Sequence, residues 1–377
     1  MKNLEKAVSE IFSKADININ GIRDWDLIVK DERFFKTVFR GMSMALGESY
    51  MDGFWDTKRL DLFFEKLYRS DMEFSRLSWT TRYYYIKANI FNMQKIARAF
   101  EIGERHYDIG NDLYKAMLGP RMIYSSLYYE KENYTVEQAE NAKLEIICKK
   151  LGLKEGMRIL DIGCGWGALG KYAAEKYGVE TVGITVSKEQ AELARKICEG
   201  LPVKILLQDY RRIQENNFDH VVSIGMIGHV GHKNYRKLME TAYHCLKDNG
   251  LFLIHTMGAN RSSTAAEPWI DRYIFPHGMA PSIKQIGRSI EDLFVMEDWH
   301  NFSVDYYRTA MDWFENFNNN WYELKPKYSE RFYRMWKYYL QGMGAAFLAR
   351  TLQTWDIVLS KQKGRGKYCS IRDSQLV

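Results

Sequence analysis

The stretch that decides the fold is Met157-Arg-Ile-Leu-Asp-Ile-Gly-Cys-Gly-Trp-Gly167. Its first half is a short apolar run, which predicts a buried strand that ends near Asp161. Gly163, Gly165 and Gly167 follow, and a helix is expected to continue through Lys176. Glycines let the backbone turn sharply and approach a ligand closely. The stretch therefore predicts a strand, a ligand-binding turn and a helix, as in nucleotide-binding α/β folds.

Strands and helices alternate after this stretch. Ser187-Lys-Glu-Gln190 is a capping-box pattern that opens a second helix, and another helix is expected at about 234–246. Apolar runs predict four further strands, at 181–185, 203–207, 218–224 and 251–256. Such alternation is typical of a doubly wound, mostly parallel sheet. We therefore predict an α/β, Rossmann-like fold whose alternation stops after Thr256.

Three other regions complete the predicted organisation. Residues 1–80 show apolar side chains at helical spacing and predict a small, mainly helical N-terminal domain. Residues 81–105 are basic and aromatic and predict an amphipathic linker suited to a membrane surface, although an ordinary packed helix fits equally well. Residues 106–377 form the predicted catalytic domain. Its aromatic-rich insertion at about 260–345 is expected to cover the carboxyl ends of the strands, where ligands of open α/β sheets bind.

Composition excludes several classes of protein. The five cysteines are scattered and odd in number, which disfavours a disulfide framework or a cysteine-rich zinc site and favours a reducing cytoplasm. No apolar run approaches the roughly 18 residues of a membrane span, and the N-terminus has no apolar signal core. We expect a cytoplasmic protein whose membrane contact is peripheral. The net charge of +6 also suits nucleic acid, but no base-reading module is visible.

The glycine loop discriminates among nucleotide cofactors. A dinucleotide site requires GxGxxG and an acidic residue about 20 positions further on, whereas here the spacing is GxGxG and the second strand ends in Thr185. A P-loop is excluded because no GK[ST] follows. S-adenosylmethionine fits better, because Asp161 offers a carboxylate to a cationic amino group. Gln208-Asp209 follows the third strand, where a side chain can read an adenine amine.

Motifs along nearly the whole chain resemble those of the cyclopropane-fatty-acyl-phospholipid synthase family. They occur in the family's order: Glu104-Arg-His-Tyr-Asp-Ile-Gly-Asn-Asp112, Tyr124-Ser125, the loop at 161–167, Leu206-Leu-Gln-Asp-Tyr210, His229-Val-Gly231, Lys233-Asn-Tyr235, Pro268-Trp-Ile270, Tyr273-Ile-Phe-Pro276 and Met296-Glu-Asp-Trp-His-Asn-Phe302. The resemblance implies a class I methyltransferase that adds a methylene group from S-adenosylmethionine across a cis double bond of a phospholipid acyl chain. It also implies a bound bicarbonate as base and a site of action at the inner membrane face. A homodimer is compatible with it.

The resemblance and the loop together assign candidate site residues. The predicted cofactor-binding residues are Tyr124, Ser125, Asp161, Gly163, Cys164, Gly165, Thr185, Gln190, Gln208, Asp209 and Tyr210. The predicted catalytic positions are Tyr107, Ser126, Gly228, His255, Met257 and Tyr306. Among these, Tyr107 matches an active-site aromatic residue, and His255 and Tyr306 match side chains that hold bicarbonate. Met257 matches a position that contributes through its backbone.

Two positions depart from the family's pattern. Ser126 stands where the family has a cysteine, a mild change because this position acts largely through its backbone. Gly228 stands where the family has a glutamate that orients the bicarbonate. A lost carboxylate removes a hydrogen-bond partner and a charge from the site.

Several consequences of the glycine at position 228 are open. One alternative is that another carboxylate replaces the missing glutamate, with Glu267 and Glu297 as candidates. A second is that the enzyme works without a full bicarbonate site. Alternatively the chain is a C-methyltransferase that gives a methyl-branched or methylene lipid. A lipid-binding homologue that keeps the cofactor but has lost turnover is the alternative outside enzymes.

Overall fold

The computed structural model describes residues 2–70, 110–364 and 368–371, which form two compact units. The first unit contains the described residues up to 70 together with Thr264–Pro276 and Tyr306–Leu352. The second contains residues 110–263, His277–Asp305 and the described residues from Gln353 onward. The predicted linker at 81–105 lies outside the described residues, so the proposed domain boundaries stay predictions. No helix in the described part of the chain is long and apolar enough to cross a membrane.

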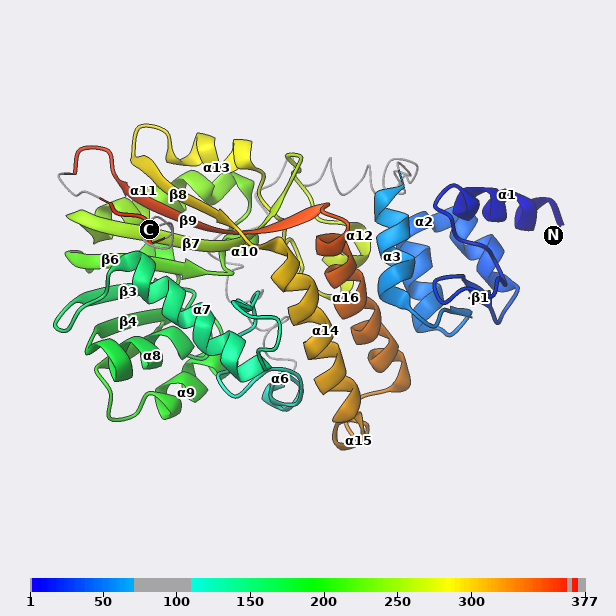
Figure 1. Cartoon of the computed structure of the whole chain (residues 1–377), viewed down its shortest axis with the longest axis horizontal. Coiled ribbons are helices and arrows are strands. Elements are labelled where there is room, and N and C mark those ends of the chain that lie inside the picture. The colour runs from blue at the N-terminus through cyan, green and yellow to red at the C-terminus, as the bar shows by residue number, and fades with distance from the viewer. Residues whose placement is uncertain (1, 71–109, 365–367, 372–377) are drawn as a thin grey trace. The chain divides into compact units, whose positions relative to one another are not determined.

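The second unit is built on a sheet of seven strands within the described residues (Figure 1). In chain order they are β3 (Arg158–Ile162), β4 (Glu180–Thr185), β5 (Val203–Leu207), β6 (Phe218–Ile224), β7 (Leu246–Ala259), β8 (Phe294–Asn301) and β9 (Leu352–Lys361). Their spatial order is β5-β4-β3-β6-β7-β9-β8. β3 pairs parallel with β4 and β6, β4 with β5, and β6 with β7, whereas β8 and β9 are antiparallel. The predicted doubly wound, mostly parallel α/β fold is confirmed.

The last two strands are a correction to the sequence-based prediction. We expected the alternation to stop after Thr256, but β8 and β9 extend the sheet beyond β7. Charged and polar residues interrupt the apolar pattern of β8, and three helices separate it from β9. Because the two strands are far apart in sequence, no short hairpin turn marks their antiparallel pairing.

Helices cover both faces of the sheet (Figure 1). Alternate residues of each strand belong to different cores, as expected from the period of two in a strand. Leu160, Val221 and Phe252 pack in one core, whereas Ile159 and Leu253 pack in another, on the opposite face of the sheet. The helices of this unit are α6 (Asn111–Met117), α7 (Val136–Leu151), α8 (Ala168–Tyr177), α9 (Lys188–Ile197), α10 (Ile227–Val230), α11 (Tyr235–Cys245) and α13 (Ile283–Ile290).

The first unit is a helical assembly with an aromatic core. Its elements are α1 (Lys2–Ser13), β1 (Ile28–Val29), α2 (Arg33–Met51), β2 (Trp55–Asp56), α3 (Leu60–Arg69), α12 (Pro268–Tyr273), most of α14 (Ser303–Asn319), α15 (Trp321–Leu324) and α16 (Glu330–Leu348). Trp55, Phe63 and Phe34 are fully buried and lie in ring contact. The α16 helix packs on α2 and α3, so part of the aromatic-rich segment at 260–345 shares a unit with the N-terminal helices.

The close packing of β7 on β9 generates a stability prediction. A β-carbon added at Gly258 of β7 would lie 2.0 Å from the ring of Trp355, which is fully buried in β9. Gly258→Ala is therefore expected to lower the free energy of unfolding by about 1–3 kcal/mol, as overpacked cores do.

Gly287→Ala in α13 is the matched control, because its new β-carbon has no atom within 4 Å. Alanine also favours a helix over glycine by up to about 1 kcal/mol. Thermal unfolding of both variants checks the prediction. Equal melting temperatures would contradict the packing described between β7 and β9.

Candidate active site

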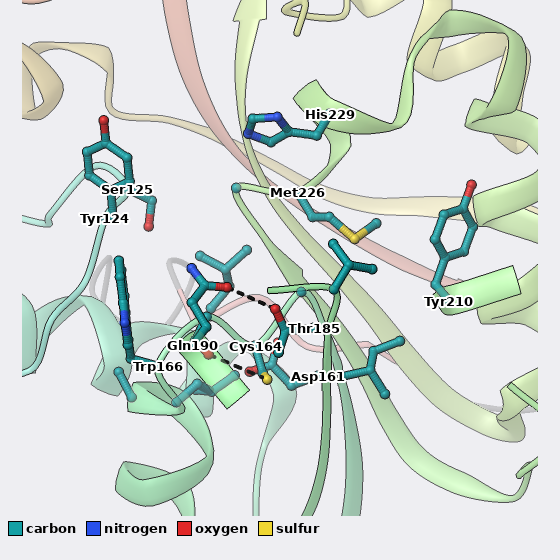
Figure 2. Close-up of a pocket in the computed structure, with 18 of the residues that line it drawn as sticks. Tyr124, Ser125, Asp161, Cys164, Trp166, Thr185, Gln190, Tyr210, Met226 and His229 are labelled. Atoms are coloured by element: carbon teal, nitrogen blue, oxygen red, sulfur yellow. Dashed lines mark hydrogen bonds between the residues drawn. The ribbon is translucent and has the colours of Figure 1, made fainter. Parts of the chain in front are cut away.

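One cavity in the second unit collects all eleven predicted cofactor-binding residues. They come from the carboxyl ends of β3, β4 and β5, from α9, and from the segment before α7 (Figure 2). Its volume of about 190 Å³ is far above the roughly 10–15 Å³ that one water molecule requires. The cavity is therefore large enough for an organic ligand. It lies at the carboxyl edge of the sheet, where ligands of doubly wound folds bind.

Asp161 is an unusual buried acid in this cavity. It lies on β3 and is 2% exposed, and its Oδ1 atom has no hydrogen-bond partner among the described residues. Burial raises the pKa of its carboxyl group from 3.8 to about 7. A buried acceptor without a partner destabilises the protein. Because the residue lines the cavity, a ligand that carries a hydrogen-bond donor or a positive charge would relieve this cost.

The glycine loop presents its backbone to the same space. Gly163, Gly165 and Gly167 have φ angles of 86°, 54° and 85°, a region that side chains disfavour. The backbone N–H groups of Gly163 and Cys164 both donate to Ile184 O at 2.9 Å, which fixes the loop against the end of β4. A β-carbon at Gly165 would meet nothing within 4 Å, so the loop leaves room for a ligand beside it.

The ends of β4 and β5 carry polar groups held by local contacts. Thr185 Oγ1 donates to Gln190 Oε1 at 2.9 Å (Figure 2), and the N-cap Ser187 accepts from the Gln190 backbone at 3.2 Å. The predicted start of this helix is thus confirmed. Asp209 accepts hydrogen bonds from the backbone and the guanidinium of Arg211, which fixes the direction of its carboxylate.

Buried charges on α7 were missed by the sequence analysis. Lys143 lines the cavity, and its Nζ atom donates to Ser125 Oγ. Burial lowers the pKa of this ammonium group to about 7. Glu140, one turn earlier, accepts from the backbone N–H groups of Arg121 and Ile123, and burial raises its pKa to about 7. The sequence signal available here was a helical pattern of charged and apolar residues. Such a pattern does not show whether the face that carries the charges is buried or solvated.

His255 belongs to a second buried group beside this helix. Its Nδ1 atom lies 2.8 Å from Asp356 Oδ1, and Asp356 Oδ2 accepts from Lys150 Nζ at 2.6 Å. All three side chains are at most 2% exposed. Burial lowers the pKa of His255 to about 4. Burial alone would raise the pKa of Asp356, but the Lys150 charge and the contact with His255 hold it well below its ordinary value.

The other predicted catalytic positions lie outside the cavity lining. Ser126 is buried and donates to Leu127 O, whereas Met257 is half-buried on β7. Gly228 lies in α10, and a β-carbon there would approach only Met279 O, at 3.5 Å. Tyr306 belongs to the first unit and stacks on Phe347 with ring centroids 4.4 Å apart. Its pairing with His255 stays a prediction.

The remaining predictions concern Tyr107 and the substitute carboxylate. Tyr107 lies outside the described residues. Glu267 caps α12 in the first unit, and Glu297 on β8 accepts from Ser360 Oγ at 2.5 Å. The carboxylate that contacts His255 is Asp356, which sequence reasoning did not single out.

Comparisons with known sequences agree with the motifs. The family described as "Mycolic acid cyclopropane synthetase" matches residues 94–357. The chain is 48% identical over 362 residues to a cyclopropane-fatty-acyl-phospholipid synthase of Escherichia coli strain K12, which covers 95% of this chain and 94% of that protein. It is 37% identical over 253 residues to a probable fatty acid methyltransferase of Pseudomonas putida, which covers 64% of each chain.

Solved structures of the same family share the fold. The cyclopropane synthase MmaA2 from Mycobacterium tuberculosis aligns with a TM-score of 0.66 at 29% identity, over 72% of this chain and all of that one. The mycolic acid cyclopropane synthase CmaA1, solved with SAH and CTAB, aligns with a TM-score of 0.65 at 28% identity, over 70% of this chain and 98% of that one. The chain therefore belongs to the mycolic acid cyclopropane synthetase family, as an S-adenosylmethionine-dependent methyltransferase of the cyclopropane-fatty-acyl-phospholipid synthase type.

Proposed function

We propose that this enzyme closes a cyclopropane ring on a cis double bond of phospholipid acyl chains. The observation that carries the proposal is a cavity lined by every predicted cofactor-binding residue, in a chain that is 48% identical to a cyclopropane-fatty-acyl-phospholipid synthase over nearly its full length. The lipid substrate implies that the enzyme works at a bilayer surface, as a peripheral protein on the cytoplasmic face of the inner membrane. Its net charge of +6 favours contact with anionic lipids.

The cavity fits S-adenosylmethionine in charge and shape. The unpartnered, buried Asp161 carboxylate would accept from the amino group, and the open backbone at Gly165 admits a ligand at close range. Gln190 and Asp209, held by Thr185 and Arg211, would receive the ribose and the adenine amine. When bound, S-adenosylmethionine supplies an electrophilic methyl group.

Aromatic side chains suit a reaction that passes through positive charge. Tyr124, Trp166 and Tyr210 line the cavity, and Tyr114 packs against the first two with ring centroids 5.2 and 5.0 Å away. The faces of such rings stabilise cations, and do so more strongly where water is excluded. We propose that these rings stabilise the sulfonium group and the cation formed on the alkene carbon.

A base must remove one proton from the added carbon before the ring closes, and we propose bicarbonate for this step. Neutral His255, whose Nδ1 faces Asp356, presents Nε2 as an acceptor for a hydroxyl group. Tyr306 is the second proposed contact. Lys143 and Lys150 add positive charge near His255, which favours an anion. When bound, bicarbonate supplies the proton acceptor.

A second candidate function follows from Gly228. Without a carboxylate at this position, the cation would lose a proton from the acyl chain, which leaves a methyl-branched chain. Alternatively, it would first undergo a hydride shift and then lose a proton from the added carbon, which leaves a methylene group. This C-methyltransferase would use the same cavity and the same methyl donor.

The two functions differ in product. The purified chain is incubated with S-adenosylmethionine and vesicles of an unsaturated phospholipid, and the extracted lipid is examined by proton NMR. High-field ring protons support cyclopropanation, whereas a branched or methylene chain contradicts it. Binding of S-adenosylmethionine with no release of S-adenosylhomocysteine would instead indicate a lipid-binding protein without turnover.

Asp161→Asn tests the assignment of the cavity to the methyl donor. Loss of a charge-assisted hydrogen bond, worth about 1.5–3 kcal/mol, is expected to weaken S-adenosylhomocysteine binding about 10- to 100-fold by calorimetry. Without ligand, the variant is not expected to melt below the wild type at pH 8. Because the pKa of Asp161 is higher in the folded state than in the unfolded state, the wild type loses stability as pH rises from about 4 to about 7. The melting temperature of Asp161→Asn is therefore expected to rise relative to that of the wild type over this range.

Asp219→Asn is the matched control for this variant. Asp219 lies at the start of β6, away from the cavity, and accepts from the Arg158 backbone and Lys247. Its replacement is expected to lower the melting temperature and to leave ligand affinity unchanged. Equal affinities for the two variants would exclude Asp161 from ligand binding.

Gly228→Glu tests the lost carboxylate. The site has room for a β-carbon, so the variant is expected to fold and to form rings at least about a hundredfold faster, the lower end of general-base effects. Gly228→Gln, of equal size but uncharged, is the control. NMR quantification of ring product compares the two, and a glutamate variant no faster than the glutamine variant would refute a simple loss at this position.

A further inference from the structure

His255 of β7, Asp356 of β9 and Lys150 of α7 meet on one face of the sheet. Asp161 pairs in register with Val222, and Val222 pairs with Leu253, which packs on the α7 side. His255 follows Leu253 by two positions, and Asp356 precedes Val358 of the same core by two positions. By the alternation of strand side chains, His255 and Asp356 therefore face α7, whose Lys150 completes the group.

The donors in this group determine how its protons are arranged. Lys150 carries only donors, so Asp356 Oδ2 must accept from it. An ionised carboxylate has no proton to give, so Oδ1 must accept as well, and the proton in the 2.8 Å contact belongs to His255 Nδ1. A neutral imidazole with its proton on Nδ1 carries a lone pair on Nε2.

Charge keeps His255 in this neutral form. Burial disfavours the imidazolium, and the nearby Lys143 and Lys150 ammonium groups oppose a further positive charge, whereas Asp356 favours one. The Asp356 charge is already balanced by Lys150 at 2.6 Å. The net result is a pKa of His255 below its ordinary value, with the Nε2 lone pair retained at neutral pH.

We infer that Asp356, held by Lys150, is a positioning residue that fixes His255 as the Nδ1-protonated tautomer. This inference rests on the proposed function, in which His255 receives the hydroxyl group of the catalytic anion. Both oxygens of Asp356 are occupied, so the carboxylate acts through His255 and not as the base itself. Asp356 thus supplies a carboxylate to the site in a chain that has glycine at position 228.

Asp356→Asn tests this inference through the tautomer. The amide must turn its oxygen to Lys150, because an ammonium group cannot accept a hydrogen bond. Its NH₂ group then faces His255, and Nδ1 becomes an acceptor with the proton moved to Nε2. Nitrogen-15 NMR of histidine-labelled protein, with His255 assigned from His255→Gln, is expected to show this exchange. S-adenosylhomocysteine release is expected to fall at least about a hundredfold, since a wrong histidine tautomer lowers kcat about 10⁴-fold in a serine protease.

Lys150→Met in the Asp356→Asn background separates this role from general damage to the fold. Methionine fills a similar volume without a donor, so the amide is free to turn its oxygen to His255. The double variant is expected to restore the NMR signal of His255 protonated on Nδ1. Its turnover is expected to be at least tenfold higher than that of Asp356→Asn. Affinity for S-adenosylhomocysteine is expected to stay within about twofold in all variants, because neither residue lines the cavity.

The possible results separate the inference from the proposed function. A wild-type His255 that is protonated on Nε2 at neutral pH would overturn the inference, as would full turnover by Asp356→Asn. Failure of the double variant to recover either signal would also overturn it. The NMR readout needs no lipid, so an Nδ1-protonated His255 in a protein that makes no ring product would overturn the proposed function and leave the tautomer assignment intact.

Discussion

Burial of opposite charges between α7 and the sheet is the interaction on which the site depends. The Lys150–Asp356 ion pair joins this helix to β9, and both side chains are essentially inaccessible to water. Removal of one partner from such a pair leaves an uncompensated buried charge, which typically destabilises a protein by about 3–5 kcal/mol. The pair therefore fixes α7 in one position over the strand ends. That position places Lys143 at the cavity and Lys150 beside the Asp356 carboxylate that contacts His255.

The same helix face connects the two halves of the chemistry. Midway along its length, α7 carries Lys143 beside Ser125, where the methyl donor is proposed to bind. Two turns later it carries Lys150, which reaches the His255 group through Asp356. A single rigid element thus sets the distance between donor and base. Such preorganisation matters because small displacements of reacting groups slow a reaction strongly.

Much of the fold and of the cavity was predictable because its signals are local. Strands β3 to β7 follow apolar runs separated by helices, and the glycine loop with the residues after β4 and β5 lies within a few positions of strand ends. Polar and charged residues interrupt the apolar pattern of β8, and its pairing with β9 is distant in sequence. The same reason hid Asp356, which is 206 positions from Lys150 and 101 from His255. Neither residue type nor spacing indicates a partner so far along the chain.

The central claim is that the reaction ends with loss of a proton from the added carbon. The most direct measurement uses S-adenosylmethionine whose transferable methyl group is fully deuterated, with vesicles of unsaturated phospholipid, followed by mass spectrometry of the acyl chains. Ring closure predicts a product that retains two deuterium atoms on the added carbon. Retention of all three would show that the proton left from the acyl chain itself, and would contradict a base acting at His255.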